Sequence, residues 1–133
     1  MLMPVRSSQE DFLLRELRKV TAMIARALGF RSRGELPAAQ AEIDNAYGSL
    51  LGPEATLLRV LDVESVVRLV GHSRKLATLA RLTAADAALA GDAGRDGERK
   101  RLIARATALA DAAVALDPTD DEAVAVATEL RAQ

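Results

Sequence analysis

The fold is decided by residues 9–51, which read QEDFLLRELRKVTAMIARALGF (9–30), RSRGELP (31–37) and AAQAEIDNAYGSLL (38–51). In the first arm, apolar residues recur every three or four positions, the spacing of one face of an α-helix: Leu13, Leu17, Val20, Ile24 and Leu28. The second arm repeats this spacing at Leu36, Ala39, Ile43, Ala46 and Leu50. Because the connection is short, the two helices are predicted to lie antiparallel as an αα-hairpin.

The ends of this hairpin are also predicted from local sequence. Residues 1–8 are expected to be a disordered lead, with Ser8 as an N-cap followed by Asp11 in the first turn. Gly29 is expected to end the first helix because glycine tolerates the left-handed conformation. Pro37 fits the first turn of the second helix, where its missing N–H costs no hydrogen bond.

Residues 53–133 continue as helices with short connections. We expect helices over 54–61 and 63–70 (two short helices or a single kinked helix), 74–90, 97–116 and 120–131. Apolar residues cover more than one face of 74–90, which predicts a central helix. The glycine-containing segment 91–98 is expected to be a flexible loop.

Several caps and inward-facing residues are assigned on the same grounds. Asp62 with Ser65 is predicted to cap 63–70, Gly71 to end that helix, and Ser73 to cap the next. A capping box formed by Thr119 and Glu122 is expected before the last helix. In that helix three residues are predicted to face the core: Val124, Ala127 and Leu130.

The chain is therefore predicted to be a single all-α domain, 1–133, of about six helices. Alanine and leucine, both strong helix formers, make up about a third of the residues, and aromatic residues only 2%. The antiparallel hairpins are expected to stack as a right-handed superhelix or to form a compact bundle.

Composition also excludes several functions. The chain has no cysteine, which removes disulfides, thiol catalysis and thiolate metal sites. Its formal net charge is −1, which gives no overall attraction to nucleic acid or to an anionic membrane. The start lacks the pattern of a secretory signal, and every apolar run is shorter than the roughly 18 residues of a membrane span. We expect a cytoplasmic protein without membrane contact.

The segment ATALADAAVALDPTDDEAVAVATEL (106–130) resembles a tetratricopeptide repeat running into the next one. Small residues and a terminal proline stand at the spacings of that motif: Ala106, Ala110, Ala113 and Pro118. The first hairpin is similar, with Ala39, Ile43, Ala46, Gly34 and Pro53. The aromatic and glycine positions of the repeat are not matched ahead of residue 106, so the likeness is to tetratricopeptide-like hairpins rather than a regular array. The chain also resembles a bacterial family of small all-helical proteins that has no assigned activity. The resemblance implies a scaffold that binds a peptide or partner helix on its concave side.

Residues able to carry chemistry are few. His72 is the only histidine and has no second histidine or cysteine with which to build a metal site, so a surface position is expected. The segment DAGRDGE (92–98) lacks the oxygen donors of an EF-hand loop. The carboxylates of Glu54, Asp62 and Glu64 are explained by capping and by a Glu64–Arg68 pair. We therefore predict no catalysis, no cofactor and no metal.

Arg15, Lys19 and Arg26 form a basic line on the first helix, away from its apolar stripe. One interpretation is a solvated helix face; the other is a contact site for an acidic peptide or for the acidic face of a second copy. The expected function is a non-catalytic protein–protein interaction or scaffold module, with homodimerisation through the first helix as a related prediction. An alternative is a nucleic-acid-binding regulator that uses the basic cluster in residues 95–105, although no recognition motif accompanies it.

Overall fold

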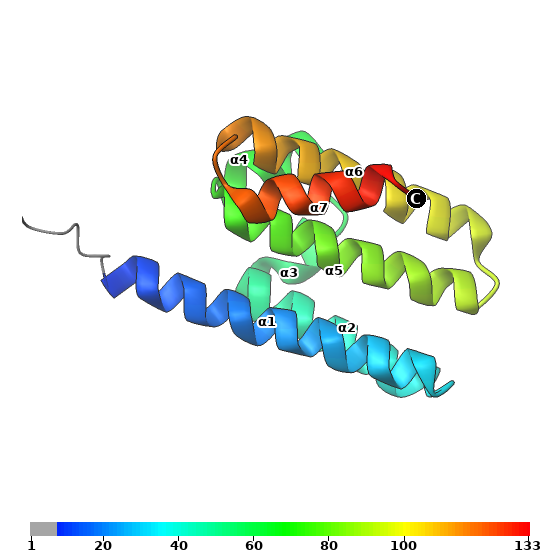
Figure 1. The fold of residues 1–133 in the computed structure, drawn as a ribbon. Coiled ribbons are helices and arrows are strands. Elements are labelled where there is room, and N and C mark those ends of the chain that lie inside the picture. The colour runs from blue at the N-terminus through cyan, green and yellow to red at the C-terminus, as the bar shows by residue number, and fades with distance from the viewer. Residues whose placement is uncertain (1–7) are drawn as a thin grey trace, which may run out of the picture.

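The protein is described here by a computed structural model in which residues 8–133 are placed (Figure 1). Its elements are α1 (Ser8–Ser32), α2 (Leu36–Leu51), the 3-10 helix η1 (Gly52–Glu54), α3 (Ala55–Leu58), α4 (Val63–Val70), α5 (Ser73–Asp92), α6 (Asp96–Leu116) and α7 (Asp121–Arg131). Residues 8–133 contain no strand, and six of the helices are at least 8 residues long. The prediction of an all-α fold with about six helices is confirmed.

Helix α5 lies at the centre, as predicted. It packs against α1, α2, α4, α6 and α7, and its buried residues occupy more than one face. Figure 1 shows α1, α5 and α7 running side by side in the same direction, while α2 and α6 return antiparallel behind them. The chain thus forms two long hairpins, α1–α2 and α5–α6, with α7 added beside α5.

The first hairpin buries most of the predicted stripes, while Leu13 and Leu36 are only partly buried. Leu17, Val20 and Ile24 of α1 face Ala39 and Ile43 of α2. The prediction for Leu28 is wrong, because its residue is 40% exposed while Ala27 is buried. A step of three from Ile24 keeps Ala27 on the inner face, whereas the side chain of Leu28 lies at the edge of the helix contact.

Helix α1 is longer than predicted at both ends. Gly29 lies within it, and the left-handed conformation belongs to Gly34, whose φ is +74°. The N–H of Glu35 then donates to the carbonyl of Phe30 at 2.9 Å, which closes the turn. Ser8 is itself helical, so the predicted disordered lead is wrong at that residue, and residues 1–7 lie outside the described part.

The segment between the two hairpins forms two separate helices. Asp62 caps α4 by accepting from the N–H of Ser65 at 3.0 Å, and Gly71 ends α4 with a φ of +61°, both as predicted. The guanidinium of Arg105 holds the preceding turn by donating to the carbonyls of Leu58 (2.8 Å) and Leu61 (2.6 Å).

Two predicted caps are wrong. His72, not Ser73, caps α5, because its Nδ1 accepts from the N–H of Lys75 at 3.4 Å. Asp120, not Thr119, caps α7, since its carboxylate accepts from two backbone N–H groups.

The region around α6 and α7 brings two further corrections. Both long helices extend into the predicted loop 91–98, so the connection comprises only Ala93, Gly94 and Arg95. Val124 is 41% exposed, while Ala127 and Leu130 are buried as predicted. Val126 faces the core in place of Val124, because the inward face of α7 begins at Ala123.

Candidate functional site

Three hollows follow one another along α5, in the space between α1 and α7. The first, of about 340 Å³, includes Leu14, Arg74, Asp117, Asp120 and Asp121 in its lining. The second, of about 370 Å³, is lined by Leu14, Leu17, Arg18, Thr21, Arg74, Thr78 and Glu122. The third, of about 220 Å³, includes Ile24, Leu28, Ala85, Val126 and Leu130. We refer to the three together as the α1–α5–α7 groove.

The first hollow is acidic. Asp120 is neutralised there by Arg74, whose Nη2 lies 3.1 Å from Oδ1, and it also accepts from the hydroxyl of Ser73 at 2.8 Å. Asp117 and Asp121 form no ion pair with residues 8–133; Asp117 accepts instead from the backbone and hydroxyl of Thr119. Two carboxylates therefore remain without a cationic partner within the described chain at this end of the groove.

Asp120 has the strongest set of charge-stabilising contacts among the acidic residues of this hollow. Burial would raise the pKa of its carboxyl group, but hydrogen bonds from Arg74, Ser73 and the N–H of Ala123 outweigh burial and hold the pKa below its ordinary value. Asp120 thus stays ionised and ties the start of α7 to the start of α5.

Cationic side chains line the second and third hollows: Arg18 belongs to the second and Arg81 to the third. Arg81 of α5 reaches α7, where its guanidinium pairs with Glu122 at 2.9 Å and with Glu129 at 3.4 Å. The buried Nε of Arg81 has no hydrogen-bond partner within residues 8–133. Arg18 on α1 is exposed and forms no ion pair with described residues. Arg18 is therefore the cationic residue of the groove that can pair with an anionic group of a ligand.

The third hollow is mostly apolar. Its floor consists of alanines of α5, and its walls are the buried Ile24 and Leu130. Leu28 lies at its rim and is 40% exposed. The groove therefore changes from acidic at the start of α5 to apolar near its end.

The predicted contact residues Arg15, Lys19 and Arg26 lie on a different face of α1. With a rotation of about 100° per residue around the helix axis, the three side chains fall within about 40° of one another. The groove residues Leu14, Arg18 and Thr21 all lie on one side of that sector. Lys19 pairs with Glu16 at 3.0 Å, and Arg26 with Glu42 of α2 at 3.1 Å. Arg15 is exposed and forms no ion pair with residues 8–133.

The basic cluster at 95–105 is divided by the fold. Arg101 forms two hydrogen bonds to Glu98, of 2.7 and 3.0 Å, and Arg105 turns inward to backbone carbonyls. Arg101 and Arg105 line a cavity, whereas Arg95 and Lys100 stay on the exposed surface.

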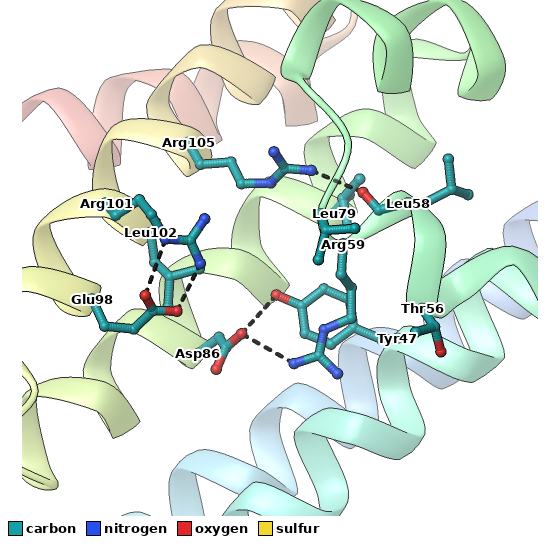
Figure 2. Close-up of a pocket in the computed structure, with 11 residues that line it drawn as sticks. Tyr47, Thr56, Leu58, Arg59, Leu79, Asp86, Glu98, Arg101, Leu102 and Arg105 are labelled. Atoms are coloured by element: carbon teal, nitrogen blue, oxygen red, sulfur yellow. Dashed lines mark hydrogen bonds and ion pairs between the residues drawn. The ribbon is translucent and has the colours of Figure 1, made fainter.

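This cavity, of about 340 Å³, lies between α2, α3, α5 and α6, and we call it the polar pocket (Figure 2). Tyr47 donates its hydroxyl to Asp86 at 3.0 Å, and Arg59 reaches the same carboxylate oxygen at 3.4 Å. The guanidinium of Arg59 also lies over the ring of Tyr47, 3.9 Å from its centroid. Sequence patterns did not identify the pocket, because its residues come from four separate elements.

Burial shifts the pKa values of two side chains in the polar pocket, Tyr47 and Arg105. Burial, reinforced by the nearby carboxylate of Asp86, raises the pKa of the Tyr47 phenol, so the hydroxyl remains a donor. Burial also lowers the pKa of Arg105, which means that its positive charge is partly removed from water. No described carboxylate pairs with Arg105.

Comparisons with protein-family models, curated proteins and solved structures found no match to this chain. Among the described residues, no helix is long and apolar enough to cross a membrane. Within that same part of the chain, no group of three or more histidine and acidic side chains is arranged to hold a metal ion. His72 is exposed at the start of α5, with its Nδ1 engaged as a cap.

Proposed function

We propose that the protein is a non-catalytic binding module whose α1–α5–α7 groove receives a segment of a partner protein. The observation that carries this proposal is the succession of three hollows along a single helix, acidic at one end and apolar at the other. Charge complementarity then selects a segment with basic side chains at one end and apolar side chains at the other.

The length of the groove matches that of a short helix. From Arg74 to Ala88, α5 rises about 21 Å, the length of about 14 helical residues or 6 extended ones. An amphipathic helix of that length can present its apolar residues to Leu28 and its basic residues to Asp117 and Asp121. Such a groove provides affinity through buried apolar surface and orientation through charge.

The resemblance to tetratricopeptide-like hairpins supports this proposal, since it implies a peptide-binding concave side. The groove differs from the site expected from sequence, because the contacts proposed now come from three helices instead of from the outer face of α1. Homodimerisation and a cytoplasmic location remain predictions.

The test uses a fluorescent peptide of about 14 residues, with lysines in its first turn and leucines along one face toward its end. Fluorescence anisotropy should give saturable binding that a scrambled peptide of the same composition lacks. The variant Asp121→Lys should weaken binding because it places a cation against the lysines. Arg18→Glu should strengthen it, because it replaces the unpaired cation of the groove with an anion.

The control is the triple variant Arg15→Glu, Lys19→Glu, Arg26→Glu, measured at the same ionic strength. It changes the charge of the protein by more than either groove variant but should alter affinity least, since none of the three residues lines the groove. If the triple variant weakens binding more than Asp121→Lys does, the contact lies on the outer face of α1 and the groove proposal is wrong.

A further inference from the structure

The polar pocket lies on another side of α5 from the groove. Leu79 and Asp86 line the pocket, whereas Thr78 and Ala85 line the groove. A ligand in the pocket therefore need not compete with one in the groove.

Three guanidinium groups line this pocket, against two carboxylates. The cations are Arg59, Arg101 and Arg105, and the anions are Asp86 and Glu98. Figure 2 shows these side chains around one cavity, coming from the turn after α3, from α5 and from α6. The lining thus holds one more positive than negative charge.

Arg105 is the source of this excess charge. Its only hydrogen bonds with described residues are those to the carbonyls of Leu58 and Leu61, and a guanidinium has five N–H donors. An anion placed beside a half-buried guanidinium that is held by neutral carbonyls has a more favourable electrostatic interaction energy than it would have in water, because the local dielectric is lower.

Arg101 can add a second contact. Its Nε and one terminal nitrogen donate to Glu98, and the other terminal nitrogen has no partner within residues 8–133. Its side chain is 56% exposed, so it stands at the mouth of the pocket. An oxyanion between Arg101 and Arg105 would receive charge-assisted hydrogen bonds from both.

The remaining walls limit the kind of ligand. Leu58, Val60, Leu79 and Leu102 supply apolar surface beside the ring of Tyr47, and the volume exceeds what a bare inorganic ion needs. We propose that the polar pocket binds a small organic molecule through a phosphate or carboxylate group held by Arg101 and Arg105.

The test measures binding of two probes, inorganic pyrophosphate and citrate, by isothermal titration calorimetry in chloride buffer of constant ionic strength. Saturable one-to-one binding of either is expected, and the tighter probe identifies the phosphate or the carboxylate as the preferred group. Arg101→Gln should weaken binding by about tenfold, because one charged donor is lost. Glu98→Gln should strengthen it, since it removes a competing carboxylate and frees Arg101.

The matched control is Lys100→Gln, which removes an exposed positive charge from the same helix outside the pocket lining. It should leave affinity unchanged. The proposal is overturned if neither probe shows saturable binding at concentrations up to about 10 mM. It is also overturned if Lys100→Gln weakens binding as much as Arg101→Gln does. Circular dichroism of each variant verifies that the helices are retained.

Discussion

The hydroxyl of Tyr47 donates to the carboxylate of Asp86 across 3.0 Å, joining the second helix of the first hairpin to the central helix. Both residues are buried, and they lie 39 positions apart in sequence. A buried carboxylate needs such donors, because an ionised group without partners costs far more than a neutral one. This contact therefore adds a buried polar link to the apolar packing of the first hairpin on α5.

Tyr47→Phe should destabilise the protein by about 1–3 kcal/mol, because Asp86 would lose its shortest hydrogen bond while staying buried. Urea denaturation followed by circular dichroism measures the change. Asp44→Asn is the comparison, since it removes the more exposed carboxylate that pairs with Arg59 at 3.2 Å. Its cost should be at most about 1 kcal/mol, as for other exposed ion pairs. Equal losses in the two variants would contradict the structural role of the buried contact.

Arg105→Lys should also be destabilising, by about 1–2 kcal/mol, because a lysine ammonium cannot reproduce the planar fork that reaches the carbonyls of Leu58 and Leu61. The loss should concentrate in the turn between α3 and α4. Hydrogen exchange should show faster exchange of the Leu61 amide in the variant, and little change at Ile43 in the first hairpin. A uniform increase across the protein would instead indicate global destabilisation.

Two glycines give predictions of opposite sign. Gly34 has a φ of +74°, so Gly34→Ala should destabilise by about 1–2 kcal/mol even though no atom lies within 4 Å of the added methyl group. Gly48 lies within α2 with no neighbour within 4 Å, so Gly48→Ala should stabilise by about 0.5–1 kcal/mol. Thermal unfolding of both variants tests the assignment of the first turn. A stabilising Gly34→Ala would contradict it.

Acid should weaken the link between α5 and α7. The folded-state pKa of Asp120 is depressed, so its stabilising contribution is present above the unfolded value of about 3.9 and is lost as pH falls through the folded value. Asp120→Asn keeps an acceptor at the helix start but removes the titration. Urea unfolding at pH 7 and pH 3 should show a smaller acid-induced loss in Asp120→Asn than in the unsubstituted protein. An equal loss would mean that other carboxylates dominate acid unfolding.

The regular helices and their pairing could be predicted from sequence, because apolar spacing reports directly which helix face is buried. The stripe Leu17, Val20 and Ile24 and the central position of α5 are examples, and both are confirmed. Helix ends were less predictable. Gly29, Ser73 and Thr119 are residue types that commonly end or cap helices, yet Gly34, His72 and Asp120 take those roles. The choice between nearby positions depends on tertiary contacts such as the one from Ser73 to Asp120.

The candidate sites could be predicted only in part. A basic line on α1 is visible in sequence, but whether its charges are open depends on partners such as Glu42, 16 positions from Arg26. The groove and the polar pocket are each assembled from elements far apart in the chain. No local pattern identifies Arg18 as unpaired or Arg105 as turned inward, since each outcome follows from which helices become neighbours.

The most direct test of the groove proposal is nuclear magnetic resonance of the protein labelled with 15N, titrated with the basic and apolar peptide. We predict that the largest amide shifts occur in the groove, at Thr21, Thr78 and Leu28, with little change at Lys19 and Arg26 on the outer face of α1. Shifts concentrated at Lys19 and Arg26, or confined to α3 and α4, would contradict the assignment of the α1–α5–α7 groove as the partner-binding surface.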